Sequence, residues 1–300
     1  MYDTIIIGGG PAGMALSLNL LRAGRSTLIL EKESFGGQIA KSPRVENLPS
    51  IKEISGLEFS DKLFEQITSL GAEFDLGTVA KIEKEGDIFK VFTDTDTYEA
   101  RSVAIANGVV HRTTGLESEE TFIGHGISYC ATCDGAFYKG EDVVIIGDAN
   151  TALQYALTLS NYCKSVQIIT LFDKFFADKI LVDRIKEKSN MSYKHEYSVT
   201  EFVGDDELNE VRFVNTKTNE PLNIKCKAVF VAIGQIPNNE AFQNLVELDR
   251  GYIVTDEHMQ TKTPGVFAIG DTRKKDVRQV ATAVNDASIA SFYIDKFLHQ

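Results

Sequence analysis

The chain begins with an apolar run, which is followed by a glycine-rich turn and then by a helical pattern of apolar positions. Residues 3–7 form a mostly apolar run that is β-branched from Thr4 to Ile7, which predicts a buried parallel strand. A helix is expected from about residue 12 to residue 23, with Gly24 as its stop signal, and a second strand over residues 27–30. A strand, a turn, a helix and a parallel strand make a βαβ unit, so the N-terminal pattern predicts an α/β fold.

The turn of this first unit has the spacing of a dinucleotide site. Gly8, Gly10 and Gly13 occupy the first, third and sixth positions of Gly-Gly-Gly-Pro-Ala-Gly. The first glycine permits the tight turn, the second lets a pyrophosphate approach the backbone, and the third lets helix and strand pack closely. Glu31 ends the next strand, eighteen residues beyond Gly13, where a carboxylate accepts hydrogen bonds from ribose hydroxyls. The alternative is a bare structural turn, but strand, helix and acid together favour a dinucleotide.

A second unit of the same kind begins at residue 142, but its turn differs. Strand 142–146 and helix 151–161 flank a turn in which Gly147 alone keeps a glycine of the pattern. Ala149 adds a Cβ where a pyrophosphate would meet the backbone, and Asp148 adds a negative charge beside it. This turn is therefore expected to hold no pyrophosphate.

The segment that follows the strand of residues 166–169 also indicates that this unit binds no pyridine nucleotide. Residues 170–176, which follow it, contain no arginine for a 2′-phosphate. Losing two or three charged hydrogen bonds of roughly 1.5–3 kcal/mol each lowers affinity by about three decades or more. The alternative is a nucleotide site that has drifted and binds weakly.

Two cysteines between these units carry the candidate chemistry. Cys130 and Cys133 are separated by two residues, so their sulfurs can meet across one helical turn, and a helix N-terminus lowers a thiol pKa. The pair could instead be half of a zinc site, but the other two cysteines stand singly, Cys163 on an expected helix and Cys226 on an expected strand. We interpret the pair as a redox dithiol and the other two as core residues.

The chain resembles the low-molecular-weight thioredoxin reductases over essentially its whole length. The resemblance is carried by Gly8 to Gly13, Gly36-Gly37-Gln38, Val45-Glu46-Asn47, Ala106-Asn107-Gly108, Cys130-Ala131-Thr132-Cys133-Asp134-Gly135, Ala232-Ile233-Gly234, Gly270-Asp271 and Arg278-Gln279-Val280. It implies an α/β fold of two Rossmann-like, FAD- and NAD(P)-binding three-layer domains, the second inserted into the first. The FAD-binding domain would comprise residues 1–112 and 238–300, and the dithiol domain residues 113–237. The two crossovers, near residues 111–114 and 236–238, would form a hinge.

The resemblance also implies roles for individual residues. Cys133 would lie against the flavin of FAD and Cys130 would attack the disulfide of thioredoxin, while Asp134 would carry the proton as general acid and base. The alternative for Asp134 is a turn or capping acid before Gly135. The FAD contacts implied by matching positions are Gly8, Gly10, Pro11, Ala12, Gly13, Glu31, Lys32, Gly36, Gly37, Gln38, Asn47, Val79, Ala106, Asn107, Gly108, Gly270, Asp271, Arg278, Gln279 and Val280.

This chain departs from the NADPH-binding half of the family at both positions described above. Its Gly-Gly-Gly turn would occupy residues 147–149, and its His-Arg-Arg-x-x-x-Arg run residues 170–176. This double departure resembles the ferredoxin-dependent flavin thioredoxin reductases, so ferredoxin or flavodoxin is expected as electron donor. An oxygen-using dithiol oxidase, a non-catalytic flavin module and an NAD(P)H-dependent reductase with a weakened site are the alternatives.

Composition and charge limit the kinds of partner and the cellular location that we expect. The net charge of −12 and pI near 5.0 argue against nucleic acid. No stretch approaches the roughly 18 apolar residues of a membrane span. Because the first strand begins by Asp3, no room for a signal peptide is expected and a cytoplasmic location is predicted. Homodimerisation is implied by the resemblance alone. Since ferredoxins are usually acidic, a local basic patch is needed, and residues 273–278 are the best candidate, with a solvated loop as the alternative.

Overall fold

The computed structural model describes residues 1–42, 45 and 47–299, so Glu46 of the Val45-Glu46-Asn47 motif lies outside the described residues. The described chain divides into two compact units. Unit 1 comprises residues 1–110 and 236–300, and unit 2 comprises residues 111–235. The boundaries expected from the sequence lie two residues from these positions. No helix among the described residues is both long and apolar enough to cross a membrane.

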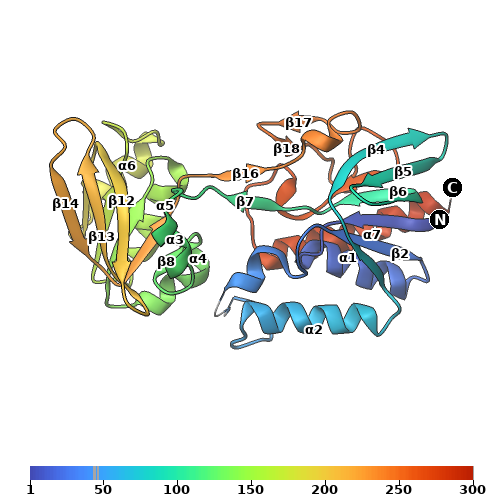
Figure 1. Ribbon diagram of the computed structural model, residues 1–300, viewed down its shortest axis with the longest axis horizontal. Coiled ribbons are helices and arrows are strands. Elements are labelled where there is room, and N and C mark those ends of the chain that lie inside the picture. The colour runs from blue at the N-terminus through green and yellow to red at the C-terminus, as the bar shows by residue number, and fades with distance from the viewer. Residues whose placement is uncertain (43–44, 46, 300) are drawn as a thin grey trace. The chain divides into compact units, whose positions relative to one another are not determined.

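Unit 1 is built around a parallel sheet whose strands alternate with helices (Figure 1). Its elements are β1 (Tyr2–Ile7), α1 (Pro11–Arg22), β2 (Thr27–Glu31), η1 (Gly37–Lys41), α2 (Gly56–Thr68), β3 (Glu73–Leu76), β4 (Val79–Glu85), β5 (Ile88–Thr93), β6 (Thr97–Ile105), η3 (Glu240–Phe242), β17 (Leu248–Asp249), β18 (Tyr252–Ile253), β19 (Val266–Ala268), η4 (Gly270–Thr272) and α7 (Val280–Leu298). Within the described residues the sheet order is β3-β2-β1-β6-β5-β4, and β19 also pairs with β6. Strand β5 pairs antiparallel with both β4 and β6, and the other pairs of this sheet are parallel.

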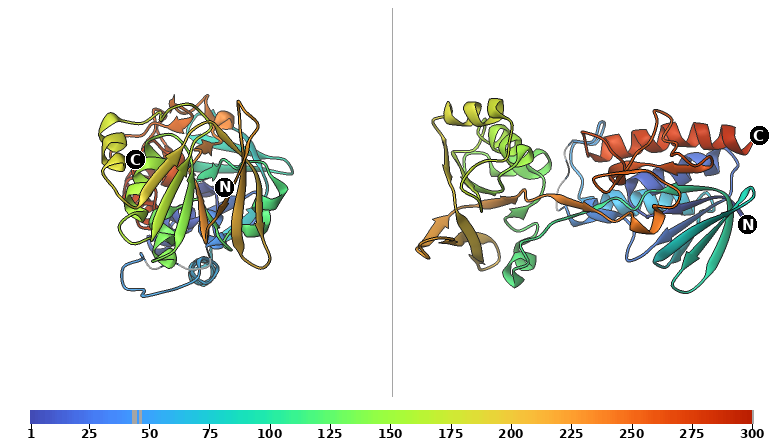
Figure 2. Two further views of the ribbon diagram at one scale, coloured as in Figure 1. Left: turned by 90° about the vertical axis from the view of Figure 1, so that its left-hand side faces the viewer. Right: turned by 90° about the horizontal axis from the view of Figure 1, so that it is seen from above.

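Alternation along the strands of unit 1 produces two cores. Ile6 and Ile29 face the helices, where they pack with residues of α1, α2 and α7. Ile5 and Leu28 point to the opposite face, where they pack with β4, β5 and η3. Helix α7 runs beside α1 on one face of the sheet (Figure 2). Unit 1 therefore has three layers, and the carboxyl ends of β1, β2 and β6 meet at the start of α1.

Unit 2 repeats this plan with a smaller sheet. Its elements are α3 (Glu117–Phe122), β8 (Ile127–Ser128), α4 (Ala131–Asp134), η2 (Gly135–Tyr138), β9 (Asp142–Ile146), α5 (Asn150–Leu159), β10 (Ser165–Ile169), α6 (Lys179–Lys186), β11 (Met191–Lys194), β12 (Tyr197–Gly204), β13 (Leu208–Asn215), β14 (Pro221–Lys225) and β15 (Ala228–Val231). The described residues form a parallel sheet of order β11-β10-β9-β15-β8 and a second, antiparallel sheet of β12, β13 and β14.

The two faces of the parallel sheet in unit 2 are covered differently. Val143 and Ile145 of β9 pack on α5 and α6, whereas Val144 and Ile146 pack on the antiparallel sheet. The sheet is thus the middle of three layers, which confirms the prediction of two three-layer α/β units. Two short strands, β7 (Val109–His111) and β16 (Gln235–Pro237), pair with one another where the chain passes between the units. They coincide with the crossovers expected from the sequence.

Candidate active site

The first glycine turn has the geometry of a pyrophosphate cradle. Gly8 has a φ of 111°, and a Cβ on it would lie 2.4 Å from the carbonyl oxygen of Ala106. A Cβ on Gly13 would lie 2.0 Å from the carbonyl oxygen of Gly8, because α1 packs closely on β1. A Cβ on Gly10 would meet no atom within 4 Å. Gly8 and Gly13 are therefore required for the fold, because a side chain on either would clash with the backbone. The space beside Gly10, in contrast, is open to a ligand.

Glu31 lies at the end of β2, where the sequence predicts a ribose contact. Its side chain is 8% exposed, and its two carboxylate oxygens accept the backbone N–H groups of Gly9, at 2.7 Å, and Glu33, at 3.0 Å. These bonds hold the carboxylate beside the glycine turn. Each oxygen still has a lone pair for a ligand hydroxyl.

Two further predicted segments meet at the same turn. Gly36 and Gly37 have φ angles of 108° and 61°, and the Gly36 N–H donates to the carbonyl of Gly9 at 2.9 Å. A Cβ on Gly37 would lie 3.3 Å from Cα of Gly10. Gly270, with a φ of 74°, is so close to Ala12 that the two Cβ atoms would be 2.9 Å apart. Segments far apart in the sequence therefore surround the start of α1.

Two buried oxygens in this region have no hydrogen-bond donor among the described residues. One is Oδ1 of Asp271, whose nearest cation is Nζ of Lys275 at 3.5 Å, and burial raises the pKa of this carboxyl. The other is Oδ1 of Asn107, whose amide nitrogen donates to the carbonyl of Asn238 and to Asn239. Unsatisfied buried acceptors are rare in native proteins and call for a donor such as a ligand hydroxyl or ring N–H.

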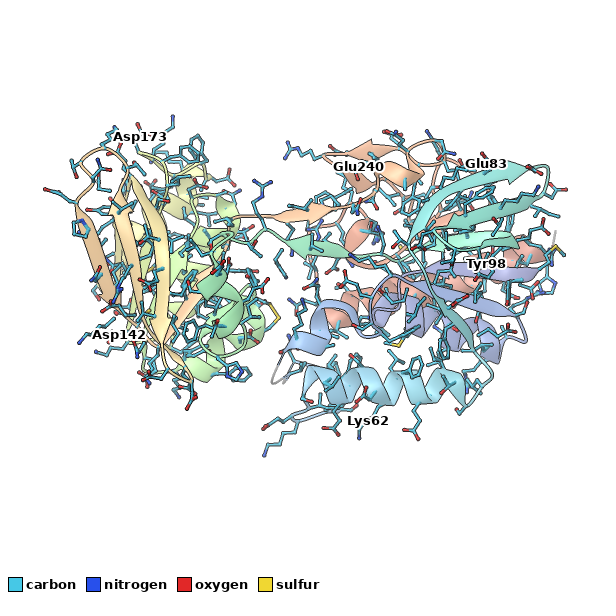
Figure 3. The ribbon with its side chains drawn as sticks, in the orientation of Figure 1. Lys62, Glu83, Tyr98, Asp142, Asp173 and Glu240 are labelled. Carbon is cyan, nitrogen blue, oxygen red and sulfur yellow. A yellow bond between two sulfur atoms is a disulfide. The ribbon has the colours of Figure 1, made fainter. Side chains whose placement is uncertain are left out.

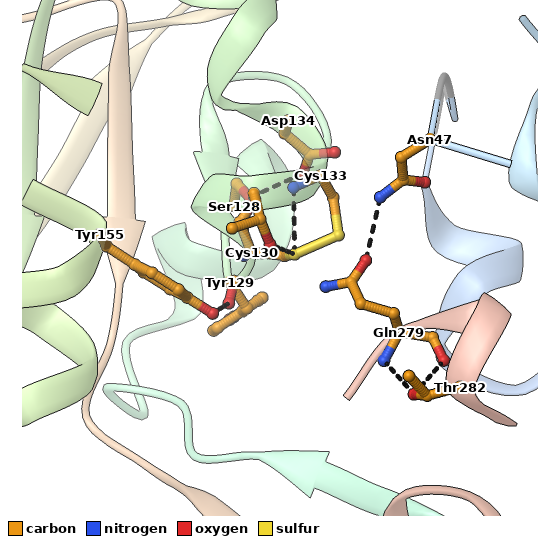
Figure 4. The surroundings of a disulfide bond; sticks show 10 residues. Asn47, Ser128, Tyr129, Cys130, Cys133, Asp134, Tyr155, Gln279 and Thr282 are labelled. Atoms are coloured by element: carbon orange, nitrogen blue, oxygen red, sulfur yellow. Dashed lines mark hydrogen bonds between the residues drawn. A yellow bond between two sulfur atoms is a disulfide. The ribbon is translucent and has the colours of Figure 1, made fainter. Parts of the chain in front are cut away.

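The remaining predicted contacts are distributed around unit 1. Asn47 donates from its amide to Oε1 of Gln279 at 2.9 Å, and Gln279 caps α7, whose first residue is Val280 (Figure 4). The guanidinium of Arg278 stacks on the ring of Tyr252. The other predicted contacts are Lys32, exposed and paired with Glu33; Gln38, exposed in η1; Val79, which begins β4; Ala106, buried after β6; Gly108, with a φ of 63°; and Pro11, the first residue of α1.

These features fit FAD. The helix start supplies backbone donors for a pyrophosphate, the space beside Gly10 admits it, and Glu31 and Asp271 supply acceptors for hydroxyl groups. Asn239 was missed in the sequence analysis. It is 1% exposed and links Asn107 to Thr272 and to the carbonyl of Gly251, so it holds the predicted flavin loops in place.

The two cysteines of the candidate redox pair lie in unit 2 and are oxidised. Cys130 and Cys133 form a disulfide with 5.3 Å between their Cα atoms (Figure 4). Cys130 is the N-cap of α4, and its Sγ accepts the backbone N–H of Cys133 at 3.2 Å. The hydroxyl of Thr132 lies 3.3 Å from the same sulfur. Two donors therefore converge on Sγ of Cys130, and both would stabilise a thiolate there.

Asp134 is held beside the disulfide by a residue that no motif revealed. The hydroxyl of Ser128 donates to Oδ2 of Asp134 at 2.6 Å, and the same oxygen of Ser128 accepts the backbone N–H of Cys130 at 3.0 Å. Ser128 ends β8, so the sheet fixes both the first cysteine and the acid. Although Asp134 is the N-cap of the short helix η2, its side chain makes no capping hydrogen bond there, which disfavours the capping alternative.

A second missed network supports the residue before the disulfide. The hydroxyl of Tyr129 donates to Oε1 of Glu119 at 2.7 Å, while Oε2 of Glu119 accepts the backbone N–H and the hydroxyl of Thr114. Glu119 is 1% exposed, and burial raises the pKa of Tyr129. His111 stacks on the ring of Tyr129. The dithiol segment is thereby tied to the chain that leaves β7.

The second glycine turn is bonded to the segment that follows β10, as the first turn is bonded to the segment that follows β2. The backbone N–H of Phe176 donates to the carbonyl of Asp148 at 2.8 Å, and Ala149 and Phe176 form a β-bridge. Asn150, the first residue of α5, donates from its amide to Oδ2 of Asp178 at 2.9 Å and accepts the Asp178 N–H at 2.7 Å. Two carboxylates, Asp148 and Asp178, therefore stand near the start of α5, and burial raises the pKa of Asp148.

The run of residues 273–278 differs from the expected basic patch. Arg273 and Lys275 both turn inward to Asp286 of α7, with Nε of Arg273 at 2.9 Å and Nζ of Lys275 at 3.0 Å from Oδ2. The side chain of Asp286 is 2% exposed and also accepts the N–H of Gly270. Two of the four cations of the run therefore share one buried carboxylate inside unit 1, and the run as a whole is not a basic surface.

The other two cysteines are buried, but the elements expected for them are wrong. Cys163 follows the end of α5 rather than lying in it, and Cys226 lies between β14 and β15. Burial raises their thiol pKa values to about 11 and about 12, respectively. Both thiols stay protonated near neutrality, as expected of small core residues.

Comparison with known proteins identifies the family. The profile described as "Pyridine nucleotide-disulphide oxidoreductase" matches residues 2–287. The thioredoxin reductase of Listeria monocytogenes is 38% identical over 100% of this chain and 95% of its own length. The chain belongs to the thioredoxin reductase family. The "34.2 kDa protein in rubredoxin operon" of Clostridium pasteurianum is also similar, 36% identical over 99% of this chain and 97% of its own. The crystal structure of thioredoxin reductase from Streptococcus pyogenes superposes with a TM-score of 0.96, at 38% identity, covering 100% of this chain and 98% of that one.

Family membership settles the coarser expectations. Members are flavin disulfide oxidoreductases with FAD as cofactor, so the predicted family, fold and cofactor are confirmed. The comparisons do not distinguish the predicted ferredoxin-dependent branch from the NAD(P)H-dependent members.

Proposed function

We propose that this protein reduces the disulfide of thioredoxin through Cys130 and Cys133, with electrons from reduced ferredoxin or flavodoxin rather than from NAD(P)H. The disulfide in a flavin-binding family supports the first part, and the relatives named thioredoxin reductase supply the substrate. The single observation that supports the second part is the pair of carboxylates at the start of α5, Asp148 in the turn and Asp178 bonded to Asn150.

The surroundings of the two sulfurs suggest different tasks for them. The backbone N–H of Cys133 and the hydroxyl of Thr132 both lie beside Sγ of Cys130. Because a thiolate is the attacking species, these donors favour Cys130 as the sulfur that attacks thioredoxin. Cys133 would then attack Cys130 in the mixed disulfide and release reduced thioredoxin.

Asp134 is placed to move the proton. Each cycle turns one thioredoxin disulfide into two thiols, which takes up two electrons and two protons, and two reduced carriers are oxidised by one electron each. FAD, when bound, would collect the two single electrons and hand them to the Cys130–Cys133 disulfide as a pair. Ser128 holds the Asp134 carboxyl close to the cysteines, where it can protonate a leaving thiolate and take the proton back.

The second turn lacks what a pyridine nucleotide needs. A pyrophosphate at the start of α5 would face the carboxylates of Asp148 and Asp178 and the Cβ of Ala149, which takes the place that Gly10 has before α1. Residues 170–176 contain no arginine for a 2′-phosphate. These losses amount to several charged hydrogen bonds at roughly 1.5–3 kcal/mol each.

The proposed direction of electron flow is downhill. A plant-type ferredoxin has a potential near about −400 mV, and thioredoxin lies near about −270 mV. Two electrons falling through roughly 130 mV release about 6 kcal/mol. A low-potential one-electron carrier can therefore drive thioredoxin reduction.

The donor is tested by anaerobic mixing. The FAD-loaded protein is mixed in turn with micromolar NADPH, NADH and reduced ferredoxin, and flavin absorbance is followed. We expect the ferredoxin to bleach the flavin within seconds and both nucleotides to leave it oxidised for minutes. The family description, "Pyridine nucleotide-disulphide oxidoreductase", favours the second candidate, an NAD(P)H-dependent reductase. Fast bleaching by either nucleotide would establish that candidate instead.

The role of Asp134 is tested by Asp134→Asn. We expect this change to lower turnover with thioredoxin by about a hundredfold, because an amide cannot carry the proton. Flavin reduction by the carrier should keep its wild-type rate, since the electron enters before the proton is needed. Ser128→Ala is the matched control, because it frees the acid without removing it and should cost less. Wild-type turnover of Asp134→Asn would mean that Asp134 is only a structural acid.

A further inference from the structure

Unit 1 carries a basic hollow that joins part of the run 273–278 to the separate β17–β18 hairpin, which the sequence did not reveal. It has a volume of about 350 Å³ and lies between the β17–β18 turn and the segment that follows η4. Four of its lining residues are basic, namely Arg250, Lys274, Lys275 and Arg278, and two are acidic, Asp249 and Asp276. The excess of positive charge stands out because the whole chain carries a net charge of −12.

Arg250 is the residue of this hollow that is hardest to explain by folding alone. Asp249 pairs with Tyr252, so Arg250 and Gly251 form a two-residue turn, and their φ angles are 52° and 86°. Both central residues thus have the left-handed backbone of a type I′ turn, for which asparagine and glycine are preferred. An arginine there is strained, and such strain recurs at functional positions. The Arg250 side chain makes no ion pair or hydrogen bond within the described part of the chain.

The other cations of the hollow differ in how far their side chains are already paired within the protein. Lys275 is 8% exposed and is held inward by Asp286, which it shares with Arg273. Lys274 pairs with Asp249 at 2.6 Å, although its side chain remains 61% exposed. The guanidinium of Arg278 lies over the ring of Tyr252 and donates from Nε to the carbonyl of Asp271, while its two terminal nitrogens make no hydrogen bond within the described residues and can meet a carboxylate. Arg250, Lys274 and Arg278 are therefore the cations that a partner can use.

The hollow adjoins the flavin loops of unit 1. Nε of Arg278 donates to the carbonyl oxygen of Asp271 at 3.4 Å, and Nζ of Lys275 lies 3.5 Å from the buried Oδ1 of Asp271. Asp271 and Arg278 are both among the residues expected to contact FAD. A protein bound at this surface would stand next to the segment that holds the flavin.

We propose that Arg250, Lys274 and Arg278 form the docking surface for an acidic ferredoxin that donates electrons to the flavin. This inference rests on the proposed function, because a nucleotide-dependent reductase would need no such surface. Arginines that bind carboxylates in a bidentate manner fix the orientation of a partner, and a local positive field opposes the repulsion between two acidic proteins. The strained turn keeps Arg250 at the rim of the hollow.

The test uses the FAD-loaded protein and a reduced plant-type ferredoxin under anaerobic conditions. The rate of flavin bleaching is measured by stopped flow against salt concentration for the wild type and for Arg250→Asn combined with Lys274→Gln. Asparagine suits the left-handed backbone, so the variant should melt at an equal or higher temperature. We expect its second-order rate constant to fall about tenfold at low salt and its salt dependence to flatten.

Three controls keep the outcomes apart. Lys62→Gln removes an exposed cation of α2 in the same unit and should leave the rate unchanged (Figure 3). Arg250→Lys, which keeps the charge, should restore most of the rate. Light-driven reduction by 5-deazariboflavin, which carries no charge, should be the same in every variant.

If the double variant is bleached by ferredoxin as fast as the wild type, or if Lys62→Gln slows bleaching equally, the docking surface is wrong while the proposed donor stands. If ferredoxin fails to bleach the wild type, the donor is wrong and the surface falls with it.

Discussion

Replacing Cys133 with serine is expected to abolish turnover with thioredoxin and to leave thioredoxin covalently attached to Cys130. Cys130 has two donors beside its sulfur, the backbone N–H of Cys133 and the hydroxyl of Thr132, so its thiol remains the one that ionises in the variant. It can attack the thioredoxin disulfide, but no second thiol follows to resolve the adduct. Turnover should fall by at least about a thousandfold.

The adduct is measured by mixing the reduced variant with oxidised thioredoxin and separating the products on a non-reducing gel. A band at the combined mass that disappears with dithiothreitol is expected for Cys133→Ser. Cys130→Ser should be equally inactive and should form no such band. The opposite result, with the adduct in Cys130→Ser alone, would exchange the roles of the two sulfurs.

A matched control for these variants is Cys226→Ala. Cys226 is 6% exposed, and burial raises its pKa to about 12, so its thiol does not react near neutrality. Turnover with thioredoxin should stay at the wild-type value, with only a loss of stability from the cavity. A general sensitivity to cysteine loss would instead lower all three variants together.

The sequence predicted those parts of the fold whose signals are local. The β-branched run before Gly8 and the apolar positions after it specified β1 and α1 within two residues, because burial and turn geometry act on neighbouring residues. The same reasoning located β9, α5 and β10. Local patterns did not place Cys163 and Cys226, which lie just beyond the ends of regular elements, where boundaries depend on tertiary packing.

The basic run at residues 273–278 shows what a linear reading leaves out. The backbone is extended at Arg273, and alternate side chains of an extended chain point to opposite sides. Arg273 and Lys275 therefore point inward and Lys274 outward. The acid that receives the inward pair, Asp286, comes eleven residues after Lys275 on α7, so no window of the sequence displays this pairing.

Long-range polar contacts were likewise hidden from the sequence. Asn239 supports Asn107 from a position 132 residues later, and Arg250 joins Arg278 at one surface from a separate hairpin. Ser128 lies only six residues from Asp134, yet a single serine before a cysteine motif carries no signal of its own. Each of these contacts depends on the sheet order, which brings together segments far apart in the chain.

Two single alanine substitutions in the first glycine turn are expected to separate FAD binding from folding. Gly10 has a φ of −78° and an open space beside its Cα, so Gly10→Ala should leave the stability of the apoprotein unchanged. The added methyl group would occupy the space predicted for the pyrophosphate and break about two of its charged hydrogen bonds. At roughly 1.5–3 kcal/mol each, FAD affinity should fall by about 10²–10⁴-fold.

Gly13→Ala should behave in the opposite way. Its Cβ would lie 2.0 Å from the carbonyl oxygen of Gly8, a backbone atom that cannot move without displacing β1 from α1. The apoprotein itself should lose about 1–3 kcal/mol or more of stability. Thermal unfolding of both apoproteins and fluorescence titration with FAD check the pair. If Gly10→Ala binds FAD as tightly as the wild type, the pyrophosphate does not lie beside Gly10, and the cofactor site must be sought away from the start of α1.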